Sequence, residues 1–416
     1  MTSKPWALVA LLSATATASY LCRVNVSVAA VLLMRDFQMS QVAIGRLFSA
    51  FVLGYAIAQV PAGMLADRWG TARVLVASAA AWVVLTAMQA AVGLGPIGRT
   101  AGGAVASLFV LRFALGVCEA PTFPAAARGV ARWIRRESQG RANGIVLAAI
   151  AVGSAIAPPA IAFMITRWGW RTALALSSLP ALAAALVWIP VARREAPRRI
   201  RESRPFAPSS LRSRSFLLLT ASYTLQGYVG YIFVFWFYLY LVQERHFDLL
   251  RSGWLASLPW ALSLVSIPLG GVISDYLVRR VGLVWGRRLV PAFGLAGAAA
   301  CTAIGAHAAN AYIAALVLAA ATASVLSVEG PFWATLMEVE GAQTATAGGI
   351  MNMGSNIGGL ISPALTPVIA ARAGWENALY VAAILALVAA VLWLGITPAG
   401  GRPASPASSA VPVPAG

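Results

Sequence analysis

The chain has 416 residues, of which 60% are hydrophobic and 11% are charged, and its mean hydropathy is +0.78. A soluble domain cannot bury that much apolar surface, and the apolar runs are long enough to cross a hydrocarbon layer of about 30 Å. The net charge of +18 could suggest a nucleic-acid partner, but the basic residues lie mostly in short segments between the apolar runs. That distribution is typical of a multi-pass membrane protein in a bilayer, so no nucleic-acid partner is expected.

The cysteines and histidines give little support to a disulfide framework, a metal site or a cofactor. Cys22, Cys118 and Cys301 lie within apolar runs and form no C-x-x-C pair, and His246 and His307 stand apart. No Ser/His/Asp set or histidine cluster is placed at membrane depth, so we do not expect an enzyme.

Apolar runs separated by polar residues predict an all-α membrane protein with twelve transmembrane helices. The first run contains Tyr20, Arg23 and Asn25 and is too long for a signal peptide, so it is read as a retained helix. The runs lie near 6–34, 42–66, 71–93, 104–124, 142–166, 172–192, 215–243, 252–274, 289–309, 311–335, 345–371 and 377–397.

Basic residues also predict the orientation and the domain boundaries. Eight arginines collect in 193–214, which we interpret as a cytoplasmic linker between a half at 1–192 and a half at 215–399. If both termini are cytoplasmic, most basic residues outside the runs fall on the cytoplasmic side, as the positive-inside rule requires. The tail 400–416 is rich in Pro, Ala and Ser and is expected to be disordered.

An internal repeat relates the two halves. The positions Gly144, Ile145, Gly153, Ile156, Pro158, Gly169 and Trp170 recur 205 residues later as Gly349, Ile350, Gly358, Ile361, Pro363, Gly374 and Trp375. Gly63 and Asp67 return as Gly271 and Asp275. Small residues and prolines at matching depths indicate duplicated halves, whose contact surface is where a substrate path is expected.

Several motifs resemble the major facilitator superfamily and, within it, the anion:cation symporter family. The superfamily signature is Gly63-Met-Leu-Ala-Asp67-Arg68-Trp-Gly70-x-x-Arg73. The family stretches are Tyr20-Leu-Cys-Arg23-Val-Asn25, Phe48-Ser-Ala-Phe51-x-x-Gly54-Tyr55 and Leu111-Arg112-Phe-x-x-Gly116-x-x-Glu119-Ala-Pro-x-Phe-Pro124.

This resemblance implies secondary active uptake of a small organic anion, such as a sugar acid or another carboxylate, by proton symport and alternating access. The alternative is an efflux pump or antiporter of the same superfamily for drugs or metabolites. The expected partners are the anion, protons and the lipid bilayer, and the transporter is expected to work as a monomer. Because thirty of the 31 basic residues are arginine, a GC-rich bacterial genome is favoured, and with it the inner membrane.

Arg23 is the leading candidate for binding an anion. It lies midway along the first run, where an unpaired charge costs roughly 2.5–3.5 kcal/mol on the lenient insertion scale. A guanidinium fork suits a carboxylate, although a permanent salt bridge to another helix is the alternative. Tyr20 lies one turn away and could add a hydroxyl, and Tyr55 matches a family position that lines the cavity. Either tyrosine could equally be a packing residue.

Glu119 is the candidate for proton coupling. Seven residues separate it from Arg112, so the two side chains lie within about 20° on one helix face. Burial favours the neutral acid and a nearby arginine favours the carboxylate, which suits a proton carrier. We expect ionised Glu119 to pair with Arg112, and protonation to free Arg112 for an anion. A purely structural cluster is the alternative.

The second half offers further candidates. Glu329 is a second intramembrane acid and a possible proton carrier. Asn352 and Asn356 share a face and could bind substrate hydroxyls or another helix. Tyr228 and Tyr231 could form a wall for a ring or belong to an interfacial belt.

Four residues of the repeated cytoplasmic signature are expected to form the inward gate: Asp67, Arg68, Arg73 and Asp275. One position departs from the family. Many members have an acid before the first arginine, and here that position is Cys22. We expect Cys22 to line the cavity without carrying a proton, which leaves Glu119 or Glu329 for that role.

Overall fold

The computed structural model describes residues 5–94, 100–195, 213–340 and 344–398, and no β-strand occurs in those ranges. The first group of helices is α1 (Pro5–Phe37), α2 (Gln41–Trp69), α3 (Thr71–Ala91), α4 (Ala101–Glu119), α5 (Thr122–Trp133), α6 (Arg136–Ser177) and α7 (Leu179–Arg194). The second is α8 (Arg214–Phe235), α9 (Phe237–Gln243), α10 (Leu249–Val281), α11 (Leu283–His307), α12 (Ala311–Ser327), α13 (Glu329–Glu340) and α14 (Thr344–Leu392) with a 3₁₀ turn at Trp393–Gly395.

The helices account for twelve membrane crossings. Ten helical stretches of the described residues are long and apolar enough to span a bilayer. Two of them, Ser138–Arg194 and Ala347–Gly395, have 57 and 49 residues, more than twice the length of about 20 residues that one crossing needs. Each bends sharply at a glycine, Gly169 or Gly374, and so counts as two crossings. The predicted all-α fold with twelve transmembrane helices is confirmed.

The bends repeat between the two groups. Gly169 and Gly374 have φ of 78° and 86°, and Gly70 and Gly282, at the turns into α3 and α11, have φ of 92° and 86°. This backbone region is open mainly to glycine, because a Cβ atom would clash. Matching glycine conformations at matching turns agree with the duplication that the sequence predicts.

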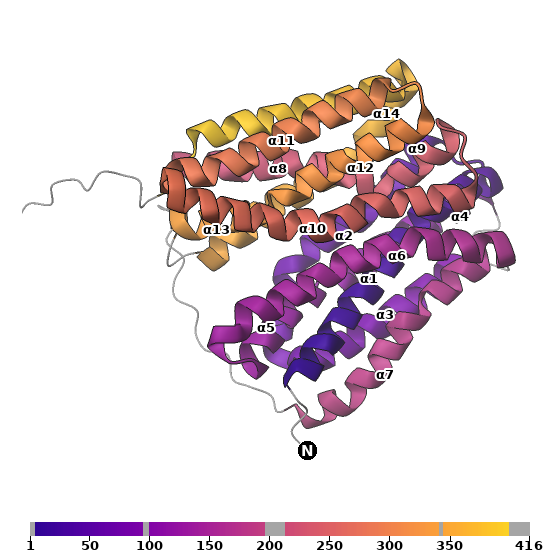
Figure 1. The fold of residues 1–416 in the computed structure, drawn as a ribbon. Helices are drawn as coiled ribbons and strands as arrows, with labels where there is room; N and C mark the ends of the chain where they lie inside the picture. Colours follow the sequence, from indigo (N-terminus) through magenta and orange to yellow (C-terminus); the bar gives the residue numbers. More distant parts are fainter. Residues whose placement is uncertain (1–4, 95–99, 196–212, 341–343, 399–416) are drawn as a thin grey trace, which may run out of the picture.

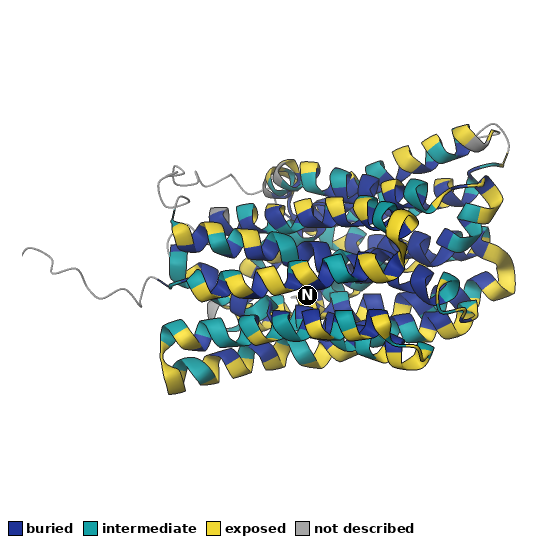
Figure 2. Ribbon diagram, turned by 90° about the horizontal axis from the view of Figure 1, so that it is seen from above, coloured by how far each residue is buried: buried dark blue, intermediate teal, exposed yellow. Residues whose placement is uncertain are grey.

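The two groups of helices lie one above the other in Figure 1. They approach closely near α9 and the start of α10, and they lie further apart near α5 and α13. Figure 2 shows buried residues along the interior and exposed residues along the outer faces. Exposed large apolar side chains such as Val110, Val265 and Phe293 occupy those outer faces, as expected of surfaces that meet lipid.

Contacts at the close end join helices of different groups. Gln41 on α2 donates from Nε2 to Gln243 Oε1 on α9 (2.8 Å), and Phe48 stacks on Phe235 with ring centroids 4.9 Å apart. Gly45 on α2 lies so close to Pro363 on α14 that a Cβ atom would collide with the proline carbonyl oxygen. Small residues therefore allow the backbones of the two halves to meet at this end.

Candidate functional site

A buried ion pair between α1 and α4 forms the centre of the site. Arg23 donates from Nε to Glu119 Oε1 at 3.0 Å, and its Nη2 lies 2.8 Å from the same oxygen. Arg23 is 4% exposed and Glu119 is fully buried. Burial strengthens the attraction between the two charges, and this attraction offsets the free-energy cost of placing Arg23 at membrane depth.

Aromatic rings surround the guanidinium of Arg23. Its Cζ lies 4.5 Å from the ring centroid of Tyr20, 4.9 Å from Tyr55 and 5.0 Å from Phe51. Arg23 Nη1 also donates to the Tyr20 hydroxyl at 3.0 Å. The rings attract the cation through their faces and hold the guanidinium in place. The structure thus brings the sequence candidates Tyr20, Arg23 and Tyr55 together.

Arg112 does not pair with Glu119, so that expectation was wrong. It donates from Nη2 to the Arg23 carbonyl oxygen (3.0 Å) and from Nη1 to the Cys22 carbonyl oxygen (3.4 Å), and its Cζ lies 4.7 Å from the Phe51 ring. Seven residues correspond to about 10.5 Å along a helix, too far for the direct contact that side chains three or four apart make. Arg112 instead fixes α1 against α4 and leaves its charge within electrostatic range of Glu119.

Several polar atoms at the centre have no hydrogen-bond partner among the described residues. They include Glu119 Oε2, Arg112 Nε and Asn356 Nδ2, all buried. An unpartnered buried polar atom is costly and usually marks a functional site or an ordered water. Glu119 therefore has one oxygen bound to Arg23 and one available for a proton.

Cys22 does not line this site, contrary to the expectation. Its thiol is fully buried and donates to the Ser177 carbonyl oxygen on α6 at 3.8 Å. One helical position rotates a side chain by about 100°, so neighbours such as Cys22 and Arg23 face different helices. Within the described residues no group of three or more His, Cys, Asp or Glu side chains could hold a metal ion.

The second half contributes amides and a tyrosine. Tyr231 on α8 donates to Asn356 Oδ1 on α14 at 3.3 Å, and it lies within electrostatic range of Arg23 across the boundary between the halves. Asn352 donates from Nδ2 to Gln59 Oε1 on α2 at 3.1 Å. The two asparagines thus contact different partners, one beside the ion pair and one between the halves.

The hydroxyl of Tyr228 contacts a different residue from that of Tyr231. The Tyr228 hydroxyl is 3.5 Å from that of Thr366 on α14, and the side chain is buried in the core. These contacts suit helix packing better than substrate binding.

Glu329 forms a separate polar cluster at the start of α13. Its Oε2 accepts from the Tyr223 hydroxyl and its Oε1 from Gln226 Nε2, both at 2.9 Å. Tyr223 precedes Tyr231 by eight residues on α8, which is about 12 Å along the helix. Both oxygens of Glu329 are thus satisfied at some distance from Arg23.

The predicted gating residues lie at the end where the two halves diverge. Asp275 pairs with Arg287 at 2.7 Å, and Arg287 also pairs with Glu338 at 2.8 Å. Arg68 is exposed. The side chain of Asp67 lies outside the described residues.

Arg73 belongs to a polar cluster around Glu195. Glu195 was not identified from the sequence as a site residue. Arg73 Nη2 donates to the Glu195 carbonyl oxygen at 3.2 Å. The buried carboxylate of Glu195 accepts from the backbone nitrogens of Thr71 (3.1 Å) and Ala72 (2.7 Å) at the start of α3, and from Arg132 Nη1 on α5 (3.3 Å). A negative charge is favourable at a helix N-terminus, so Glu195 joins α3, α5 and α7.

Phe51 and Gln59 were also missed as site residues. Phe51 lies between both central arginines, and its only signal was its place in the family stretch Phe48-Ser-Ala-Phe51. Gln59 follows Tyr55 by one helical turn, which could have placed it on the same face.

Comparison with known proteins identifies the family of this chain. The family model described as Major Facilitator Superfamily matches residues 11–339 and 280–415. The chain belongs to the major facilitator superfamily. It is therefore a multi-pass membrane transporter rather than an enzyme.

Curated superfamily relatives include the probable sulfoacetate transporter of Cupriavidus necator, 29% identical over 375 residues that cover 86% of this chain and 85% of the relative. The hexuronate transporter of Bacillus subtilis is 25% identical over 413 residues, 93% of each chain. A probable galactarate/D-glucarate transporter of Escherichia coli K12 is 26% identical over 403 residues, 89% of this chain and 88% of the relative.

Solved structures share the superfamily fold. A bacterial homolog of the human lysosomal transporter Spinster, in an inward-facing and occupied conformation, gives a TM-score of 0.79 at 17% identity and covers 95% of this chain and 97% of its own. A D-xylose–proton symporter gives a TM-score of 0.77 at 14% identity, with 95% and 98% covered.

Proposed function

We propose that this transporter carries a small organic anion together with protons by alternating access. The observation that supports the proposal most directly is the buried Arg23–Glu119 pair with its aromatic surround. The relatives are named for sulfoacetate, hexuronate and galactarate or glucarate, all organic anions. An arginine fork is the side chain that binds such groups with two parallel hydrogen bonds.

The anion and the proton would be coupled through a change of partner at Arg23. While Glu119 is ionised, it occupies the guanidinium. A proton on Glu119 neutralises the carboxylate and leaves Arg23 without a counter-charge, which the carboxylate of a substrate then supplies. Because neither change is favourable alone in a buried site, the two ligands bind together. Arg112 would keep a constant positive charge nearby and hold α1 in register.

The orientation would place both termini in the cytoplasm. The contacts of Gln41, Gly45 and Phe48 then close the outer end of the interface, and the α5 and α13 ends face inward. The Gln59–Asn352 bond is a further contact between the halves, on the inward side of Tyr55 along α2. This conformation would be closed to the outside, and the Gln59–Asn352 hydrogen bond would lie between the site and the cytoplasm.

The test uses purified Glu119→Gln protein in proteoliposomes. Glutamine keeps the size of the side chain and cannot titrate, so a pH gradient should no longer drive accumulation, while exchange of labelled for unlabelled anion should continue. Glu244→Gln, at an exposed acid, is the matched control and should retain both activities. Accumulation that still follows the pH gradient in Glu119→Gln would overturn the coupling role and direct attention to Glu329.

A further inference from the structure

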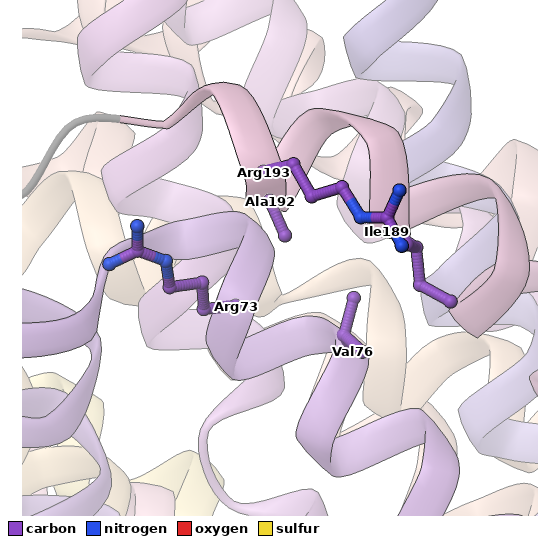
Figure 3. Close-up of a pocket in the computed structure, with 5 residues that line it drawn as sticks. All are labelled: Arg73, Val76, Ile189, Ala192 and Arg193. Carbon is purple, nitrogen blue, oxygen red and sulfur yellow. The ribbon is translucent and has the colours of Figure 1, made fainter.

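A hollow of about 400 Å³ lies between α3 and α7, away from the Arg23–Glu119 pair. Figure 3 shows its five lining residues: Val76, Ile189 and Ala192 are apolar, and the guanidinium groups of Arg73 and Arg193 extend to opposite sides of the group. Both arginines are exposed. Arg73 is in the first turn of α3 and Arg193 in the last turn of α7, so the hollow lies at the ends of two spanning helices.

The surface beyond the hollow is apolar. Val84 on α3 is 57% exposed, and Leu186 and Val187 on α7 are 57% and 55% exposed. Because α3 and α7 belong to candidate membrane spans, these side chains face the hydrocarbon region rather than water. A molecule that binds at the arginines can therefore also contact this apolar surface if it has an apolar part. A free inorganic anion has no such part.

We propose that this hollow binds the headgroup phosphate of an anionic phospholipid, with the acyl chains along the outer faces of α3 and α7. Arginine binds phosphate oxygens through its planar fork, and two guanidinium groups at the level of the headgroups supply the complementary charge. The nearby carboxylate of Glu195 does not oppose this binding strongly, since it is buried and already bonded to Thr71, Ala72 and Arg132.

Lipid binding at this site would affect the packing of α3, α5 and α7 at the cytoplasmic end of the first half. Arg73 contacts the Glu195 backbone, and Glu195 joins α3 to α5. A phosphate held by Arg73 and Arg193 would add a second link between α3 and α7. The proposal does not depend on which substrate the transporter carries.

The experiment measures lipid binding to the full-length purified transporter by native mass spectrometry and by the shift in its melting temperature. The probes are phosphatidylglycerol and cardiolipin, with phosphatidylcholine and inorganic phosphate as comparison ligands. We expect both anionic lipids to bind, and the double variant Arg73→Gln/Arg193→Gln to weaken their binding by about tenfold or more. Arg279→Gln/Arg280→Gln, which removes two exposed arginines at the end of α10, is the matched control and should bind like the unmodified protein.

Three outcomes would overturn the proposal. Equal binding of phosphatidylcholine would indicate an apolar surface without headgroup recognition. Inorganic phosphate that binds as tightly as the lipids would indicate a free-anion site. Equal losses in the two double variants would indicate a general charge effect. If the double variant fails to fold, the single variant Arg193→Gln provides the same comparison, since Arg193 is exposed at a helix end.

Discussion

Arg23 carries its charge midway along a membrane-spanning helix, and its surroundings supply both a counter-charge and a rigid frame. Glu119 balances the charge, while Tyr20, Phe51 and Tyr55 surround the planar group. A cation over an aromatic face gains about 2 kcal/mol or more when desolvated. The side chain is therefore held in a fixed orientation before any ligand arrives, which reduces the entropy lost on binding.

Arg23→Lys is expected to weaken anion binding by about tenfold or more, since a hydrogen bond to a charged group contributes about 1.5–3 kcal/mol and lysine lacks the second parallel donor. Isothermal titration of the purified variant measures the change. Arg46→Lys, an exposed arginine on α2, is the matched control and should bind normally. Unchanged affinity in the Arg23 variant would make Arg23 a structural residue.

At the scale of single residues the sequence predicts which residues belong to the site, but not which side chain each of them contacts. Tyr20, Arg23, Tyr55 and Glu119 were all selected from motifs and burial cost, and they do lie together. The predicted Arg112–Glu119 pair failed because a helical wheel describes neighbours within one helix, whereas the structure pairs α4 with α1. For the same reason the sequence did not predict what the thiol of Cys22 contacts, since that depends on where α6 packs.

Glu195 acts at the scale of helices. One carboxylate bonds the first two backbone nitrogens of α3 and an arginine of α5, at the end of α7. An acid within a segment that has many arginines gives no sequence signal, because only the three-dimensional approach of α3 and α5 shows what it binds.

Glu195→Gln should lower the free energy of unfolding by about 1–3 kcal/mol, because an uncharged amide can place an N–H group near the backbone N–H donors of α3 and removes the negative charge that Arg132 contacts. Thermal unfolding of the detergent-solubilised protein measures the loss. Glu244→Gln again serves as the control. A melting temperature equal to that of the unmodified protein would show that the cluster contributes no stability.

The close contact of α2 and α14 leads to a second prediction for these elements. Gly45→Ala places a methyl group against the Pro363 carbonyl and the Pro367 ring. The helices should separate there, and the population should shift toward conformations open at that end. Distances between spin labels at the start of α2 and at the Gly374 bend of α14 would report the shift.

Gly230→Ala is a suitable comparison for Gly45→Ala, since a Cβ atom there meets nothing within 4 Å in the described part of the chain. Its label distances should match those of the unmodified protein. Identical distance distributions in the Gly45 variant and the unmodified protein would show that the contact does not control closure.

The whole molecule was the easiest scale to predict. Apolar runs and the recurrence of Gly169 and Trp170 at Gly374 and Trp375 were enough for twelve helices in two related halves, because both features depend on spacing alone. How closely the halves approach at each end could not be predicted, since that depends on contacts such as Gln41–Gln243 between residues far apart in the sequence.

The orientation of the molecule remains a prediction with a direct test. Alkaline phosphatase fused within 193–214 or after Gly400 should be inactive, because the enzyme folds only outside the cytoplasm, whereas fusions near Arg99 or His307 should be active. The basic residues of the linker are the reason for this expectation. An active fusion in the linker would reverse the assignment.

The proposed change of partner at Arg23 would also determine how the transporter responds to voltage. The empty site contains two arginines and an ionised Glu119; in the proposed loaded site Glu119 is neutral and the substrate supplies the negative charge. With a singly charged substrate both forms have the same net charge, so the membrane potential neither drives nor opposes transport. A doubly charged substrate adds one negative charge to the loaded form, and a potential that is negative inside opposes its entry by about 2.3 kcal/mol per 100 mV. The number of carboxylates on the substrate would thus decide whether voltage limits its accumulation.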